Sequence, residues 1–348
     1  MKAIGYLQPQ AIEQNDALID IELPIPEAIG LDLLVKIQAV SVNPADTKVR
    51  ATAAPEADQY KILGWDAVGE VVAVGELVQS FKVGDQVWYA GDITRPGSNA
   101  EYQLVDERIV GKKPLLVSNA EAAAMPLTAI TAWELLFDRL GFTPLLSSNA
   151  KEASLSALKP RILIVGAGGG VGSILVQLAK QLTNATVIGT ASRPESARWV
   201  AELGADNVIN HYQPLLPQLN DLGIDNVSHV ISLTHTDKHF DQLVEVLEPQ
   251  GKLALIDDPS EPLDIMKLKP KSLSIHWEFM FTRSMFNTSD MKKQHLLLTS
   301  IANLVDSGSI KTTLGESFGT INAANLKRAH AYIETNQAVG KVVLEGFK

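Results

Sequence analysis

The chain has 348 residues, of which 46% are hydrophobic and 20% charged, so it is long enough for two domains with hydrophobic cores. Its formal net charge is −10 and it has no basic block, which argues against nucleic acid as a partner. It contains no cysteine, which excludes disulfides, a thiol nucleophile and thiolate metal ligands. No run approaches the ~20 apolar residues of a membrane span, and Met1–Tyr6 lacks an apolar signal core. We therefore expect a cytoplasmic protein without a membrane partner.

The first part of the chain, over roughly 125 residues, has the pattern of a β-rich domain. A helical stretch, Glu121–Asp138, follows it and is interrupted by Pro126. Thr143–Leu158 is polar and rich in small residues, which predicts a mobile surface connection. The expected early strands, separated by Gly, Pro and Asp turns, are Val35–Val42, Ala67–Val74, Gln86–Tyr89 and Ala100–Val105.

Next comes a short apolar strand, Arg161–Ile164, then a glycine-rich run, Val165–Gly172, and then a helical stretch, Ser173–Lys180. Strands and helices continue to alternate, which predicts an α/β fold with a doubly wound parallel sheet covered on both faces. The further elements are Thr186–Thr190, Pro194–Leu203, Asn207–Asn210, His229–Leu233, His239–Leu247, Lys252–Ile256 and Leu273–Trp277.

The glycine-rich run has the strand, turn and helix context of a dinucleotide site. Glycines let the backbone turn tightly and approach a pyrophosphate, and the helix N-terminus offers N–H groups to it. A tight turn without a ligand is the alternative. The candidate cofactor-binding residues are Ala167, Gly168, Gly169, Gly170, Val171 and Gly172.

The C-terminal part predicts two amphipathic helices, Gln294–Val305 and Asn322–Thr335, and a final strand, Gly340–Leu344. We expect a β-rich domain over residues 1–126, a nucleotide-binding domain over 127–283, and a segment over 284–348 that returns to the first domain. A cleft between the two domains is the expected place for a ligand.

Ordered motifs along nearly the whole chain resemble the medium-chain dehydrogenase/reductase superfamily, in its quinone oxidoreductase-like branch. The resemblance is closest to proteins called zinc-type alcohol dehydrogenase-like, and it implies a GroES-like domain beside a Rossmann domain. The motifs are Asn43-Pro44-x-Asp46 within Ser41–Arg50, Gly64–Val71, Phe81–Val87, Leu127–Trp133, Ala167-x-Gly169-x-x-Gly172, Trp277–Arg283 and Gly340–Leu344.

The resemblance also raises the question of zinc. In zinc-dependent members the first Cys ligand would fall near Asn43 and the His ligand at Trp65, and the first histidine of this chain is His211. Zinc favours nitrogen and sulfur donors, so we expect no catalytic zinc. Without a Lewis acid, oxidation of an alcohol becomes less favourable than reduction of a quinone or an α,β-unsaturated carbonyl.

The cofactor is expected to be NADPH. The residues that recognise the ribose 2′-hydroxyl of NADH or the 2′-phosphate of NADPH lie about 20 residues beyond the glycine fingerprint. At this place the chain has Ser192 and Arg193 instead of an acidic residue. Alternatively, Ser192 caps the helix that starts near Pro194. His211 stands where the family often has a Tyr beside the adenine ribose, so it either stacks there or is a surface histidine. The resemblance also places Lys341 among the cofactor-binding residues.

The resemblance places three candidate catalytic residues, Asn43, Asp46 and Thr131, near the nicotinamide. Asn43 would position the ribose or a substrate oxygen, Thr131 would hydrogen-bond near the ring, and Asp46 would orient Lys48 or the backbone. Alternatively, Asn43 and Asp46 form a turn and cap a helix. Related quinone reductases often have Tyr at the Lys48 position, so the proton donor is Lys48 or water. Family dimers pair at Leu273–Trp277, which implies a homodimer.

Three functions remain open at this point. The first is an NADPH-dependent, zinc-independent reductase of quinones or α,β-unsaturated carbonyls. The second is an alcohol dehydrogenase that borrows a metal, and the third is a cofactor-binding redox sensor with little turnover.

Overall fold

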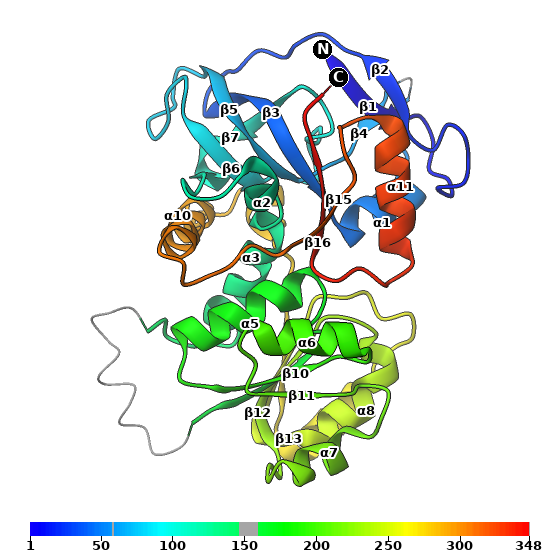
Figure 1. The fold of residues 1–348 in the computed structure, drawn as a ribbon, viewed down its shortest axis with the longest axis vertical. Helices are drawn as coiled ribbons and strands as arrows, with labels where there is room; N and C mark the ends of the chain where they lie inside the picture. The colour runs from blue at the N-terminus through cyan, green and yellow to red at the C-terminus, as the bar shows by residue number, and fades with distance from the viewer. Residues whose placement is uncertain (58, 146–158, 348) are drawn as a thin grey trace. The chain divides into compact units, whose positions relative to one another are not determined.

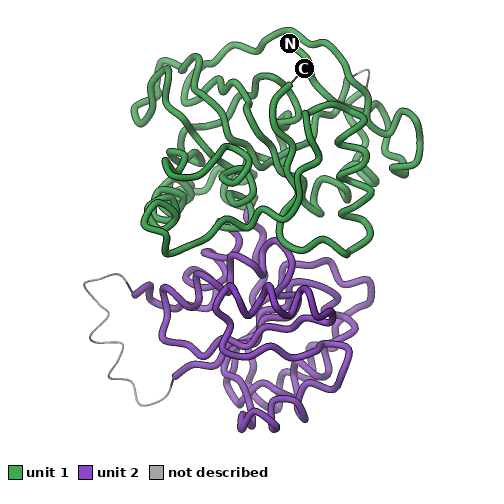
Figure 2. The backbone as a smooth tube through the Cα atoms, viewed as in Figure 1, with its two compact units in different colours: residues 1–130, 281–348 green, residues 131–280 purple. Residues whose placement is uncertain are grey.

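The computed structural model describes residues 1–57, 59–145 and 159–347, so most of the predicted surface connection, residues 146–158, lies outside the described residues. The chain forms two compact units, which Figure 2 distinguishes by colour. Unit 1 comprises Met1–Ile130 and Phe281–Lys348, and unit 2 comprises Thr131–Met280. The expected domains, with borders after residues 126 and 283, stay a prediction.

Unit 1 is built on two β-sheets. The larger sheet has seven strands in the order β15-β16-β3-β5-β6-β8, with β7 paired to β3, and the smaller has the order β2-β1-β4. Its longest strand, β3, contributes apolar residues such as Leu33, Val35 and Ile37 to the buried core. The strand bounds are β1 Lys2–Tyr6, β2 Ile19–Glu22, β3 Asp32–Val42, β4 Lys61–Ile62, β5 Asp66–Val74, β6 Gln86–Ala90, β7 Tyr102–Asp106, β8 Val110–Lys112, β15 Leu314–Ser317 and β16 Lys341–Glu345.

Two helices of unit 1 begin at asparagine residues, a type that is favoured at helix N-caps. Asn43 is the N-cap of α1, Pro44 is its first residue, and Asp46 completes a capping box. Asn322 caps α11, which packs against α1 (Figure 1). The bounds are α1 Pro44–Thr52, α2 Asn119–Ala123, α3 Pro126–Trp133 (which enters unit 2), α9 Thr282–Met285, α10 Lys293–Asp306, α11 Ala323–Glu334 and a 3₁₀ turn, η1, Glu107–Ile109.

Unit 2 contains a six-stranded sheet in the order β11-β10-β9-β12-β13-β14, with every pair parallel. In chain order this is 3-2-1-4-5-6, the order of a Rossmann fold, which confirms the expected fold class. The strands β9, β12, β13 and β14 end at the same level of the sheet. Ser232 at the end of β12 pairs with both Val165 and Leu255, and Leu255 pairs with Trp277. The bounds are β9 Arg161–Val165, β10 Thr186–Thr190, β11 Asn207–Ile209, β12 Val227–Ser232, β13 Leu247–Leu255 and β14 Ser274–Trp277.

Helices complete unit 2. Leu215 and Leu219 from α7, with Phe240 and Leu243 from α8, join strand residues such as Leu163 in one buried cluster. The segment expected as a broken helix over Glu121–Asp138 forms α2, α3 and then a π-helix, η2. None of the helices in the described part of the chain combines the length and apolarity that crossing a membrane requires. The bounds are η2 Glu134–Arg139, α5 Gly170–Leu182, α6 Pro194–Glu202, α7 Leu215–Asp221, α8 Thr236–Val246 and a 3₁₀ helix, η3, Ile265–Lys271.

Candidate functional site

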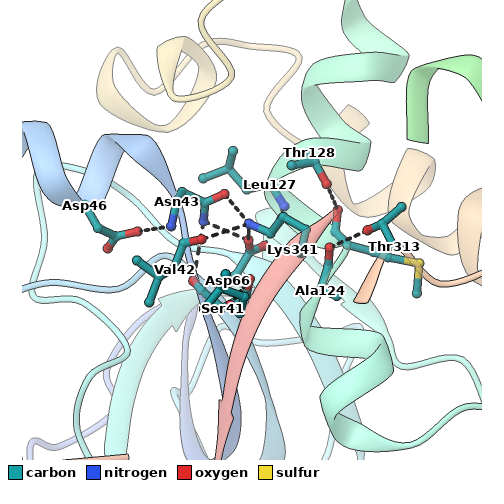
Figure 3. Close-up of polar contacts among 12 residues, drawn as sticks. Ser41, Val42, Asn43, Asp46, Asp66, Ala124, Leu127, Thr128, Thr313 and Lys341 are labelled. Carbon is teal, nitrogen blue, oxygen red and sulfur yellow. Dashed lines mark hydrogen bonds and ion pairs between the residues drawn. The ribbon is translucent and has the colours of Figure 1, made fainter. Parts of the chain in front are cut away.

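Unit 1 holds a buried polar cluster, which we call the Asp66 cluster and define as Asn43, Asp46, Asp66 and Lys341 (Figure 3). Strand pairing brings these residues together although nearly the whole chain separates the first from the last. The end of β3 pairs with β5 on one side, where Ser41 is opposite Asp66, and with β16 on the other, just after Lys341.

The ammonium of Lys341 is held entirely by acceptors of unit 1. Its Nζ lies 2.9 Å from Asp66 Oδ2 and 3.4 Å from the carbonyl oxygen of Val42, and it also donates to Asn43 Oδ1. Lys341 is 3% exposed and Asp66 is fully buried. These three acceptors match the three N–H bonds of an ammonium group, so the charge of Lys341 is neutralised inside the protein.

The carboxylate of Asp66 binds two further donors. Asn43 Nδ2 donates to Asp66 Oδ2 at 2.8 Å, and the backbone N–H of Leu127, in the first turn of α3, donates to Oδ1 at 2.7 Å. Asn43 Nδ2 also lies 3.4 Å from the carbonyl oxygen of Ser41. Asp66 was not among the residues predicted from the sequence, although it lies in the Gly64–Val71 motif.

Asp46 holds the backbone of the turn between β3 and α1. Its carboxylate accepts from the backbone N–H groups of Asn43, at 2.7 Å, and Gly64, at 2.9 Å. Burial raises the pKa of Asp46 to about 7, against the lowering effects of the Asn43 hydrogen bond and the Lys341 charge. Asp46 therefore contacts the backbone at the start of α1 and at Gly64, and its role at the nicotinamide stays a prediction.

The other two candidate catalytic residues lie on α1 and α3. Lys48 is exposed on α1, two residues beyond Asp46. Thr131 is buried on α3, at the first position of unit 2. Their proposed roles as proton donor and nicotinamide contact stay predictions.

In unit 2 the glycine-rich run forms a close turn between β9 and α5. Gly166 has a φ of +82°, which favours glycine. A Cβ on Gly172 would lie 2.5 Å from the backbone of Ala167, so only glycine allows this approach. Gly169 is the N-cap of α5 and provides no side-chain cap, so the first-turn N–H groups suit a pyrophosphate. These residues fit a dinucleotide cofactor.

A threonine links the glycine turn to the ends of the neighbouring strands. Thr190 Oγ1, at the end of β10, accepts from the N–H of Gly166 at 3.1 Å and lies 3.0 Å from His211 Nδ1. His211 is half-buried, and its ring centroid lies 5.8 Å from that of His239. Burial lowers the pKa of His211, and the neighbouring histidines, His239 and His235, lower it further.

Ser192 and Arg193 lie in the turn after Ala191, which follows the end of β10, and both are half-buried. The N-cap of α6 is Arg193, so the alternative that Ser192 caps this helix is wrong. Ser196 Oγ donates to the carbonyl oxygen of Arg193 at 3.0 Å, which supports the first turn instead. Ser192 and Arg193 thus come after the end of β10, and His211 comes after the end of β11. Strand β10 is the neighbour of β9, which leads into the glycine turn.

A second buried acidic group, which the sequence did not reveal, lies in unit 2. Arg139 Nε donates to Glu278 Oε2 at 2.7 Å, and its guanidinium lies 3.9 Å from Glu134 Oε2. Burial, followed by the charge of Glu134 and a hydrogen bond with it, raises the pKa of Glu278 to about 9 despite the opposing effect of Arg139. Burial and the nearby Glu134 therefore favour the protonated form of Glu278.

The positions at which the resemblance would place zinc ligands do not suit zinc. Asn43 presents its oxygen to the Lys341 ammonium, whose charge repels a divalent cation. Trp65 is buried and packs edge-on against Phe281 at a centroid distance of 5.6 Å. Within the described residues no three His, Cys, Asp or Glu side chains form a group that could hold a metal ion. The donor set therefore does not fit a zinc ion.

Comparisons with known proteins agree with this architecture. A family model described as zinc-binding dehydrogenase matches residues 203–344, and a model of the alcohol dehydrogenase GroES-like domain matches residues 30–115. A zinc-type alcohol dehydrogenase-like protein of Staphylococcus aureus is 38% identical over 99% of both chains. A 2-methylene-furan-3-one reductase of Solanum lycopersicum is 29% identical over 99% of this chain and 79% of its own.

Solved structures extend the match. A protein from Rhizobium etli, whose name places it among zinc-dependent alcohol dehydrogenases, has a TM-score of 0.94 and 52% identity over 100% of this chain and 98% of its own. A mycobacterial protein, Rv1454c, solved with NADPH, has a TM-score of 0.80 and 26% identity over 99% of this chain and 100% of its own. The chain therefore belongs to the medium-chain dehydrogenase/reductase superfamily of oxidoreductases, together with the zinc-type alcohol dehydrogenase-like proteins.

Proposed function

We propose that the protein is an NADPH-dependent, zinc-independent oxidoreductase that reduces quinones or α,β-unsaturated carbonyl compounds. The observation that carries this proposal is the Asp66 cluster, in which the Lys341 ammonium binds the side chain at the expected metal-ligand position. A quinone or enone accepts hydride at carbon, and the charge spreads over an enolate or quinol oxygen that needs no metal. The reductase name of the tomato relative supports this substrate class.

The bound nicotinamide would supply the hydride, and it would be left oxidised. First-turn N–H groups of α5 would bind the pyrophosphate, while Asn43 and Thr131 would orient the reacting groups. The substrate gains one proton besides the hydride, and we assign its delivery to Lys48 or to water.

The preference for NADPH is proposed from the residues that follow β10. Ser192 and Arg193 stand where an NAD site has an acid, and Arg193 suits a 2′-phosphate. His211, fixed by its contact with Thr190, would lie beside the adenosine ribose. The NADPH complex of the mycobacterial relative supports the same cofactor.

We also propose a homodimer formed through β14, and the cytoplasmic location stays a prediction. Among the described strands, β14 has only β13 as a neighbour, so its other edge is available for pairing with a second copy. Trp277, at the end of this strand, is 53% exposed, which suits an interface residue.

The test is a turnover assay with chelated protein. We expect consumption of NADPH with p-benzoquinone, methyl vinyl ketone or trans-hexenal, and no dependence on added zinc. Matched reactions with NADP⁺ and the saturated alcohols that share the carbon skeletons of the ketone and the aldehyde are expected to be inactive. Zinc-dependent oxidation of an alcohol would contradict the proposal, and tight NADPH binding without consumption by any acceptor would favour a sensor instead.

A further inference from the structure

Asp66 connects three elements, β3, β16 and α3, that carry predicted site residues. Its Oδ1 accepts from Leu127 at the start of α3, and its Oδ2 accepts from Asn43 at the end of β3 and from Lys341 on β16 (Figure 3). A fully buried carboxylate with donors on both oxygens has little freedom to move. It therefore fixes the relative positions of these three elements.

The contacts of Asp66 and Lys341 also determine the orientation of the Asn43 amide. The oxygen of this amide faces the Lys341 ammonium, and its nitrogen faces the Asp66 carboxylate and the Ser41 carbonyl. A flipped amide would place N–H against the ammonium and oxygen against the carboxylate, which is unfavourable at both ends. Asn43 is thus held in one orientation by a cation and an anion together.

The same carboxylate supports the first turn of α3. Pro126 opens this helix without an N–H, and the N–H of Leu127 lacks an intrahelical acceptor at that position. A negative charge at a helix N-terminus is favourable, so Asp66 stabilises α3 at its start. Thr131 lies four residues after Leu127 on this helix, which is about one turn further on.

We propose that Asp66, with Lys341 as its counter-ion, is a positioning residue for the hydride transfer described above. It acts through the Asn43 amide and the start of α3, and neither charged group contacts the cofactor or the substrate. This inference rests on the proposed function. It also changes the role of Lys341, which the sequence assigned to the cofactor, to that of charge balance inside unit 1.

Three variants separate positioning from simple stabilisation. Asp66→Asn removes the charge while keeping the size, and we expect kcat for enone reduction to fall about tenfold to a hundredfold, as for a small misplacement of a reacting group. The Kd for NADPH is expected to stay within about threefold, since loss of a transition-state interaction affects kcat rather than binding. The hydride-transfer isotope effect with 4-deuterated NADPH is expected to rise.

Lys341→Met leaves a buried carboxylate without its cation, so we expect it to be the least stable variant. The double variant Asp66→Asn/Lys341→Met removes both charges and is expected to regain most of the lost thermal stability without regaining turnover. Recovery of kcat along with stability would overturn the proposal, because a merely structural ion pair predicts that result. As a matched control, Asp32→Asn breaks the bidentate pair with Arg95 in the same unit and is expected to keep kcat.

A second readout does not depend on turnover. In a ¹⁵N spectrum the side-chain N–H groups of Asn43, assigned with Asn43→Ser, are expected to exchange slowly with water in the native protein. They are expected to exchange quickly in Asp66→Asn, whereas Asp32→Asn leaves them unchanged. Slow exchange in Asp66→Asn would overturn the positioning role. Native protein that consumes no NADPH with any acceptor would refute the proposed function, and the Asn43 signals would still decide whether Asp66 fixes this amide.

Discussion

Replacing Glu278 with Gln tests whether this buried acid is neutral in the folded protein. Glu278 is 2% exposed, and burial beside Glu134 raises its pKa from 4.5 to about 9. Between these two values the unfolded chain has released the proton and the folded chain retains it. The folded protein therefore loses stability as the pH rises through this window, and a fully retained proton gives a slope of about 1.4 kcal/mol per pH unit.

Glutamine is close in size to glutamic acid and has no proton to release, so Glu278→Gln removes this slope. We expect the variant to gain stability relative to the native protein as the pH rises from about 5.5 to about 8. The difference in free energy of unfolding should grow by about 1.4 kcal/mol per pH unit. Urea unfolding at several pH values in this range measures this difference directly.

Glu202→Gln is the control, because Glu202 is exposed on the same unit. Its difference from the native protein is expected to vary little over the same pH range. A pH-independent difference between Glu278→Gln and the native protein would refute the reasoning, since it would mean that Glu278 ionises alike in both states.

Four further predictions concern the cofactor, the metal and the assembly. Arg193→Ala should raise the KM for NADPH about tenfold or more, from loss of a charge-assisted bond, with little change for NADH; equal effects would count against a 2′-phosphate site. Gly172→Ala should abolish detectable NADPH binding by calorimetry, because the added Cβ meets Ala167 at 2.5 Å, and unaltered affinity would contradict the glycine-turn assignment. Prolonged chelation should leave enone reduction unchanged, with elemental analysis showing less than stoichiometric zinc before treatment. Trp277→Arg should convert a dimer to a monomer by light scattering, and a dimer that persists would argue against pairing through β14.

The fold could be predicted in large part because its signals are local. Arg161–Ile164 and Thr186–Thr190 are short apolar runs beside helical stretches, and both are strands in the structure. The π-helix at Glu134–Arg139 was not predicted, because its first residues continue the apolar pattern of α3. The short helix Leu215–Asp221 was also missed, since a proline stands within it.

The candidate site was predictable where a motif is contiguous and was missed where strand pairing creates it. The glycine turn needs only neighbouring residues, so its sequence is sufficient to indicate it. Asp66 and Lys341 are 275 positions apart and meet because both β5 and β16 pair with β3. A single aspartate at the start of an apolar strand gives no sign of its counter-ion, although its burial requires one.

That requirement is met within the fold itself. A buried Asp66 without a cation would be costly, and Lys341 supplies a cation that is part of the fold. The same ammonium also binds Asn43, so one charge stabilises the carboxylate and orients the amide. A metal added there would have to displace an ammonium whose three acceptors are already in place, and only one of those acceptors is a carboxylate. The residues at the expected zinc-ligand positions and the Lys341–Asp66 pair are therefore consistent parts of one arrangement.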